Sequence, residues 1–278
     1  MGAGFRQWMH YLTPSDAHRR LGLVCLGVGH QEGHLPTVGP RTMRNHVAVV
    51  VTEGKGWFRH GAGPLLEVAA PAVLWLFPGV PHHYAPYDPG WTEWFVDFTG
   101  PAVAAYQGLG FLDPAAPVTP LTTADLPVQA IGRIARACRL GSPYLEVETS
   151  AIVHDVLVAL RRCRADEHPG GEPVLARLAR DACLPLSVTE HARRLGMPPA
   201  ELRQVVRRLT GSSPKDYLLT VRLNRAKDLL ATSGLPVAAV ARRVGYDDAA
   251  YFTRIFTRRV GLPPSEFRAQ HYRGLTLN

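Results

Sequence analysis

The chain has 278 residues, of which 46% are hydrophobic and 19% charged, and its formal net charge is +8. This length predicts two domains. No run of 18 or more apolar residues and no apolar stretch of signal-peptide length is present, so we expect neither a membrane span nor a secreted protein. Four widely spaced cysteines form no CxxC pair, which favours reduced thiols in the cytoplasm over disulfides or a zinc site; they are Cys25, Cys138, Cys163 and Cys183.

The positive charge is concentrated in the last third of the chain. Residues 172–278 hold 18 Lys+Arg against 9 Asp+Glu, a net charge of +9, and residues 1–171 hold 13 against 14, a net charge of −1. An excess of arginine confined to one region indicates a polyanionic partner. The alternative interpretation is a surface that only keeps the protein soluble.

Residues 30–100 are rich in glycine, proline, valine and aromatic residues, which is typical of short strands joined by turns. Four apolar runs predict strands at 46–51, 57–60, 72–77 and 93–98. Three Gly- or Pro-containing stretches predict turns at 53–56, 61–64 and 78–81. Several short strands with regular turns predict a β-sandwich or barrel.

The hydrophobic period changes near residue 126. Apolar residues then recur three or four positions apart in residues 126–140 and 144–164, which predicts two amphipathic helices. The stretch ADEHPGGEP at 165–173 breaks this period and predicts a linker. The rest of the chain is helical in period and shows no strand signal.

Residues 236–259 predict two helices joined by a tight turn. Gly245 ends the first helix, because glycine accepts the left-handed conformation, and Asp247 or Asp248 caps the second. Phe252 and Phe256 face the core by their spacing. By elimination the outward face of the second helix holds Ala249, Ala250, Thr253, Arg254, Thr257 and Arg258. Small residues, methyl groups and arginines suit a helix that enters a major groove, although a solvated, ion-paired surface is the commoner use of such arginines.

Residues 187–209 repeat this arrangement. Gly196 ends a short helix, and Pro198 and Pro199 suit the start of the next one. The outward face of that second helix holds Ala200, Glu201, Arg203, Gln204, Arg207 and Arg208. A continuous helix of about 18 residues connects the two motifs and spans roughly 27 Å, close to the roughly 34 Å of one turn of B-DNA.

The segment from "LSVTEHARRLGM" to "GYDDAAYFTRIFTRRVGLPPSEFR" closely resembles the DNA-binding domain of the AraC/XylS family of bacterial transcription regulators. The resemblance implies a cupin-like sensor barrel at 1–125, a helical dimerisation segment at 126–164, a linker at 165–173 and a double helix-turn-helix domain at 174–273. It also implies base contacts from Ala200, Glu201, Arg203 and Gln204 in the first motif, and from Ala249, Ala250, Thr253 and Arg254 in the second. Arg207 and Thr257 would lie nearer to phosphate.

The strand-rich region resembles the cupin-like sensor domain of the same family, through "VVVTEGKGWFRH", "LFPGVPHHY" and "WTEWFVDFTG". A small barrel of this kind holds one small ligand. By the resemblance, Tyr84, Thr92 and Trp94 align with sugar-contacting positions. Arg41, Trp57 and His82 are neighbours by argument only, and the tryptophans are equally compatible with ordinary core packing.

The pair His82-His83 invites a metal interpretation, but adjacent residues on a strand point to opposite faces. We therefore expect no metal, no cofactor and no enzyme. We expect a homodimeric regulator that binds double-stranded DNA, responds to a small molecule such as a sugar, and contacts RNA polymerase. The rivals are a metal-dependent cupin enzyme fused to a DNA-binding module, and a dimeric regulator that needs no ligand.

Overall fold

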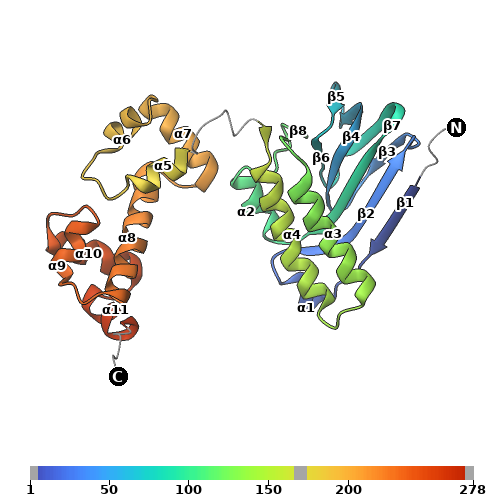
Figure 1. Ribbon diagram of the computed structural model, residues 1–278. Helices are drawn as coiled ribbons and strands as arrows, with labels where there is room; N and C mark the ends of the chain where they lie inside the picture. Colours follow the sequence, from blue (N-terminus) through green and yellow to red (C-terminus); the bar gives the residue numbers. More distant parts are fainter. Residues whose placement is uncertain (1–5, 166–173, 273–278) are drawn as a thin grey trace. The chain divides into compact units, whose positions relative to one another are not determined.

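The computed structural model describes residues 6–165 and 174–272, and it divides near residue 170 into two compact units, an N-terminal unit and a C-terminal unit (Figure 1). Most of the predicted linker, residues 166–173, lies outside the described residues. The N-terminal unit contains an antiparallel sheet with helices, and the described part of the C-terminal unit is all helical. The expected fold class is confirmed.

The N-terminal unit is built in the following order: β1 (Arg6–Tyr11), α1 (Asp16–Arg19), β2 (Val24–Gly33), β3 (Val38–Thr42), β4 (His46–His60), β5 (Leu65–Ala69), β6 (Ala72–Leu76), β7 (Pro81–Thr99), α2 (Val103–Gly108), β8 (Val118–Pro120), α3 (Asp125–Leu140) and α4 (Leu145–Arg162). The strands form one eight-stranded sheet in the order β1-β2-β7-β4-β6-β8, with β3 paired to β7 and β5 to β4. The two helices expected near residues 126–164 are α3 and α4.

One expected turn is wrong. Residues 53–56 lie inside β4, which continues through them while remaining paired with β7 on both sides of two register shifts. Such bulges absorb extra residues and bend a strand without ending it. Gly54 has a φ of +92°, and a Cβ atom there would lie 2.5 Å from the backbone oxygen of Gly90. Glycine therefore allows the close approach of β4 to β7 at this position. The turns expected at 61–64 and 78–81 are confirmed.

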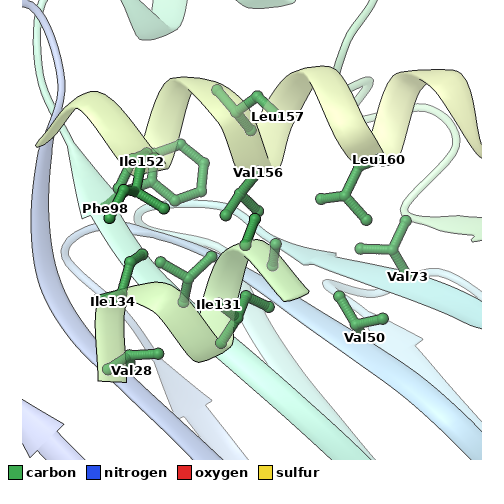
Figure 2. Packing of buried hydrophobic residues seen from close by; sticks show 14 of the residues in the cluster. Val28, Val50, Val73, Phe98, Ile131, Ile134, Ile152, Val156, Leu157 and Leu160 are labelled. Carbon is green, nitrogen blue, oxygen red and sulfur yellow. The ribbon is translucent and has the colours of Figure 1, made fainter. Parts of the chain in front are cut away.

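The sheet has two apolar faces, because successive residues of a strand point to opposite sides. Ala48 and Val50 of β4 belong to one buried cluster with Ile131 of α3 and Leu157 of α4. Figure 2 shows Val50 beside Ile131. Val49 points to the opposite face, into a second cluster that also holds Tyr84 and Phe95. The first face carries the helices, and the second surrounds the candidate sensor site.

The C-terminal unit contains α5 (Val174–Arg180), α6 (Val188–Arg194), α7 (Pro199–Thr210), α8 (Pro214–Thr232), α9 (Val237–Arg243), α10 (Ala249–Val260) and α11 (Pro264–His271). Its helices pack around two separate cores. One surrounds α6 and α7 and includes Leu202, and the other surrounds α9 and α10 and includes Phe252. Helix α8 contributes Leu218 to the first core and Leu230 to the second. Burial of each such side chain contributes about 1.5–3 kcal/mol.

Candidate DNA-binding surface and sensor cavity

The first motif consists of α6, a glycine turn and α7. Ser187 caps α6: its Oγ accepts the Glu190 amide at 3.3 Å, while the Glu190 carboxylate accepts the Ser187 amide at 2.7 Å. The Ser187 hydroxyl, which donates to the Glu190 carboxylate at 2.6 Å, and the Ser187 amide hold the pKa of Glu190 below its usual range. Gly196 turns the chain with a φ of +73°, and α7 begins at Pro199, where a missing amide hydrogen costs nothing.

Helix α7 buries Leu202 and Val206 and leaves the opposite face in solvent. Six side chains on that face are exposed: Ala200, Glu201, Arg203, Gln204, Arg207 and Arg208. Arg203 and Arg207 line a surface hollow of about 560 Å³ together with Arg259 from the end of α10. The Arg259 guanidinium is 2.8 Å from the Asp216 carboxylate. This grouping of guanidinium groups suits an anion such as a phosphate.

The second motif consists of α9, the turn at Gly245 and α10. Asp248 is the N-cap of α10: its Oδ1 accepts the backbone amides of Ala250 at 2.8 Å and Tyr251 at 3.1 Å. These bonds hold the pKa of Asp248 below its usual range. Of the two acids proposed from the sequence, Asp248 is therefore the cap.

The face of α10 opposite its core is less exposed than that of α7. Ala250, Arg254 and Arg258 are exposed, whereas Thr253 and Thr257 are half-buried. Ala249 was expected to face outward, but it is half-buried and packs against the core of its own motif. The Thr253 hydroxyl donates to the backbone oxygen of Ala249 and the Thr257 hydroxyl to that of Thr253, both at 2.8 Å.

Helix α8 fixes the two motifs to each other. The Arg222 guanidinium donates to the backbone oxygens of Ala182 at 2.6 Å and Leu184 at 2.9 Å, and it lies 5.4 Å from the Tyr246 ring centre. Gly245 lies against the same loop, because a Cβ atom there would be 2.6 Å from the Cys183 backbone oxygen. The turn of the second motif is therefore packed on the chain that leads into the first.

The N-terminal unit holds a cavity of about 140 Å³ on the face of the sheet opposite α3 and α4. Residues from β1, β2, β3, β4 and β7 line it together with Met43: Met9, Tyr11, Gln31, Val38, Arg41, Met43, Val47, Val49, Tyr84, Glu93, Phe95 and Asp97. Tyr84, Glu93 and Asp97 are buried, with 2%, 1% and 7% of their surface exposed. Arg41 is exposed, and its Nε donates to the His82 ring at 3.1 Å.

The charged groups of this cavity are strongly perturbed. Burial raises the pKa of Glu93 to about 7, although its Oε2 accepts the Trp91 indole N–H at 3.0 Å. Burial likewise raises the pKa of Asp97 to about 6, against the opposite influence of Arg41. Burial and the Arg41 charge lower the pKa of His82 to about 4, so that His82 accepts a hydrogen bond as a neutral ring. Perturbed groups around a cavity mark a candidate binding site.

Both units match known family models. A model described as an AraC-like ligand binding domain matches residues 27–142, and one described as a helix-turn-helix domain matches residues 191–270. The chain belongs to the AraC family of transcriptional regulators. This is a family of regulators rather than of enzymes.

Relatives within the AraC family match along most of the chain. The arabinose operon regulatory protein of Salmonella typhimurium is 28% identical over 83% of this chain and 85% of its own length. The MmsAB operon regulatory protein of Pseudomonas aeruginosa is 28% identical over 82% of this chain and 76% of its own. Among solved structures, the DNA-binding domain of AdpA in complex with a target DNA is 32% identical over 35% of this chain and 87% of that one, with a TM-score of 0.33.

Of the sensor residues expected from the AraC-family resemblance, some line the cavity, one contacts a lining residue, and the others lie outside it. Arg41 and Tyr84 line the cavity. His82 is not part of the lining, but its ring accepts a hydrogen bond from Arg41. Trp94 does not line the cavity; it packs on His30 and Trp8 and against the cluster under α3 and α4. The expectation that Trp94 contacts a ligand in this cavity is therefore corrected.

Thr92 and Trp57 also lie outside the cavity lining. Thr92 shares the strand face of Trp94, since the two are separated by one residue of β7. The Trp57 ring packs edge-on against His83, with ring centres 4.7 Å apart. His82 and His83 point to opposite faces, as expected, and no group of three potential metal ligands occurs among residues 6–165 and 174–272.

Thr92 and Trp94 were expected at the cavity, but the residues of this part of β7 that line it are Glu93, Phe95 and Asp97. They alternate on β7, which is the signal that sequence reasoning missed: one face of WTEWFVDF carries two acids and a phenylalanine. The sequence did not reveal which residues of β7 share a face, because both faces of this strand are largely buried.

None of the described helices is long and apolar enough to cross a lipid bilayer.

Proposed function

We propose that this AraC-family regulator recognises specific operator sequences by placing α7 and α10 in successive major grooves on one side of the duplex. The observation that carries the proposal is the pair of exposed, arginine-bearing helices α7 and α10, which belong to two motifs packed on one helix, α8. Helix α8 has 19 residues, which at 1.5 Å per residue span about 28 Å, and it contributes Leu218 to the core of the first motif and Leu230 to that of the second. The Arg259–Asp216 ion pair joins the end of α10 to the start of α8.

The residues proposed to read base edges are Ala200, Glu201, Arg203 and Gln204 on α7, and Ala250, Thr253 and Arg254 on α10. Six of these side chains are exposed and Thr253 is half-buried, and half-buried Ala249 and the cap Asp248 border the set. Arg207, Thr257 and Arg258 are proposed to lie beside phosphates. Arg203 and Arg207 share their hollow with Arg259, which adds Arg259 to the phosphate contacts.

Binding of the full-length protein to the DNA upstream of its own gene, measured across a salt series, tests this proposal. We expect preferential binding to that DNA over a random duplex, and affinity that falls steeply with salt as counterions are released. A double variant, Arg203→Ala with Arg254→Ala, should abolish the preference. The matched control is Arg59→Ala, which removes an exposed arginine from the N-terminal unit. Equal affinity of the wild type for both duplexes would contradict the proposal.

The N-terminal cavity is proposed to bind a small effector whose binding changes the placement of two DNA-binding units in a homodimer. Such coupling typically amounts to about 1–3 kcal/mol. The expected sugar retains support from Arg41 and Tyr84, which line the cavity, and loses that of the tryptophans. A regulator of this kind binds chromosomal DNA in the cytoplasm and alters contact with RNA polymerase.

The dimer is proposed to form through α3 and α4. Exposed apolar side chains support this, because Leu140 and Tyr144 are 77% and 73% exposed at adjoining ends of the two helices, and Val147 follows one turn later. Large apolar side chains gathered on one surface indicate a contact with another protein. Sedimentation of Leu140→Asp should show a loss of dimer relative to the wild type.

A further inference from the structure

The buried charged groups that line the sensor cavity are acidic. Glu93 and Asp97 are almost completely buried on β7, while Arg41, the cationic side chain of the lining, is exposed on β3. In the part of the chain that the structure describes, no ion pair joins Arg41 to either carboxylate, and Arg41 instead donates to His82. Two acids therefore share the cavity without an ion-pair partner.

One carboxylate oxygen of these acids lacks a hydrogen-bond partner, although the Asn45 side chain beside the carboxylate opposes the rise in the pKa of Asp97. The Oδ1 atom of Asp97 is buried and unpaired, and Asp97 itself is 7% exposed. A buried carboxylate without a partner is strongly unfavourable, and proteins retain such groups mainly at functional sites. An acid needed only for packing would be fully hydrogen-bonded inside the core. The unpaired oxygen and the empty volume beside it point to a missing ligand group.

The ligand group that suits this arrangement is a cation that can donate several hydrogen bonds. A primary ammonium has three N–H donors and one positive charge, and it is small enough for a confined site. Glu93, Asp97 and the Tyr84 hydroxyl supply acceptors around it from one face of β7. A neutral hydroxyl group would also donate hydrogen bonds to these acceptors, but it would add no positive charge to that of Arg41 beside the two buried carboxylates.

We infer that the effector proposed above carries a positively charged amino group, which binds between Glu93 and Asp97 in the cavity. The inference rests on the proposed function of this cavity as an effector site. The volume of about 140 Å³ is well below the roughly 300–1,000 Å³ of sites for drug-sized ligands. The effector is therefore a small amine, such as an amino alcohol or an amino sugar, and Arg41 at the entrance meets its polar end.

Matched probes separate an amine from a polyol. Binding to the full-length protein is measured by calorimetry and by thermal shift for ethanolamine against ethylene glycol, serinol against glycerol, and D-glucosamine against D-glucose. We expect the amine of at least one pair to bind ten times or more tighter than its hydroxyl counterpart. Equal binding, preference for the hydroxyl compound, or no binding by any of the amines would overturn the inference.

Two variants test the residues. Glu93→Gln and Asp97→Asn keep the shape of each side chain and remove its charge, so each should reduce amine affinity tenfold or more. The matched control is Glu53→Gln, which changes an exposed acid on β4 and should leave amine binding unaltered. Amine preference that survives in both charge-removing variants would contradict the inference.

Proton release gives a measurement on the wild type that does not depend on whether a variant folds. Binding of a cation favours the ionised carboxylates, and burial holds the pKa of Glu93 near 7 and that of Asp97 near 6. Amine binding at pH 6–7 should therefore release protons, and amine affinity should rise from pH 5.5 to 8. Calorimetry in two buffers of different ionisation enthalpy measures the release, and a value of zero would count against the inference.

Two other groups beside the acids, His82 and Tyr84, keep their charge state in this pH range. The pKa of His82 is lowered to about 4 and that of Tyr84 is raised well above 10, both mainly by burial. Arginine remains protonated. The groups around the acids are Tyr11 on β1, Arg41 on β3, and His82 and Tyr84 on β7.

DNA binding by the same preparations separates failure of this inference from failure of the proposed function. If the protein prefers its upstream DNA but no amine, the inference fails and the proposed DNA recognition stands. If the amine binds but no operator preference appears, the DNA-recognition proposal fails and the amine site stands.

Discussion

The two helix-turn-helix motifs have the same order of elements and second helices of 12 residues each, but they are constructed differently. Helix α7 starts at two prolines without a side-chain cap, whereas Asp248 caps α10 through two amides. Helix α7 exposes Glu201, Arg203 and Gln204, whose side chains end in hydrogen-bonding groups. In the proposed complex this difference would make the first motif recognise DNA mainly through polar groups.

The residues of α10 proposed to read base edges are alanine and threonine beside Arg254, whereas the exposed Arg258 is proposed to lie beside phosphate. Both threonine hydroxyls donate to the helix backbone, so the hydroxyl hydrogen is already used and the methyl group is available for contact. Methyl groups match the thymine methyl in a major groove. In the proposed complex the second motif would therefore depend more on shape and apolar contact, with Arg254 as the charged group among its base-reading residues.

The glycines in the turns of the two motifs also differ in their surroundings. Gly196 and Gly245 both have positive φ, +73° and +85°. A Cβ atom at Gly196 would meet nothing within 4 Å, whereas one at Gly245 would lie 2.6 Å from the Cys183 oxygen. The first turn needs glycine only for its conformation, and the second also needs it for space.

Replacement of the two turn glycines should have the largest effect. Gly245→Ala combines a left-handed alanine with a backbone clash, and should lower the free energy of unfolding by about 3 kcal/mol or more. Gly196→Ala adds only the conformational cost, about 1–2 kcal/mol. Urea denaturation followed by the helical circular dichroism signal measures both. Equal losses would mean that the Cys183 loop moves away without cost.

Arginine replacements compare base contact with phosphate contact. Arg254→Ala should cost about 1–3 kcal/mol on the preferred DNA and relax specificity at one base pair. Arg207→Ala should weaken binding to all sequences alike and reduce the salt slope by about 1. Affinity measured on a set of single-base operator variants distinguishes the two. Equal losses for Arg254→Ala on specific and random DNA would contradict base contact by this residue.

The sequence predicted the C-terminal unit well because its signals are local. Glycine turns, proline starts and a 3.6-residue period act within a few positions, and they located both motifs and the long helix between them. The half-buried state of Ala249 could not be read this way, since it depends on how closely α9 packs against α10.

The sensor site was predicted less well because it depends on strand register. Shifting an alignment by one residue moves every side chain of a strand to its other face. That shift assigned Thr92 and Trp94 to a cavity that Glu93 and Phe95 occupy. Apolar residues on both faces of β7 removed the alternation that would have fixed the register, and only the pairing with β2 and β4 resolves it.

The caps compare how the two second helices are stabilised. Asp248→Ala removes both amide hydrogen bonds and should lower the melting temperature by about 2–4 °C. Asp248→Asn retains an acceptor and should change it less. The lowered pKa of Asp248 means that its stabilisation is present above the unfolded-state pKa and is lost as the pH falls through the folded one. A melting series from pH 7 to 3 should show this loss in the wild type and not in Asp248→Ala.

Two replacements of Thr253 separate its methyl group from its hydroxyl and should have the smallest effects. Thr253→Val keeps the shape and removes the hydroxyl, which donates to the Ala249 oxygen, so DNA affinity should change by less than about twofold. Thr253→Ser keeps the hydroxyl and removes the methyl group, which should weaken binding about fourfold, the equivalent of one buried methylene. Affinities on the preferred operator decide between the two groups. If valine weakens binding more than serine does, the hydroxyl contacts the DNA, and α10 relies on hydrogen bonds in the same way as α7.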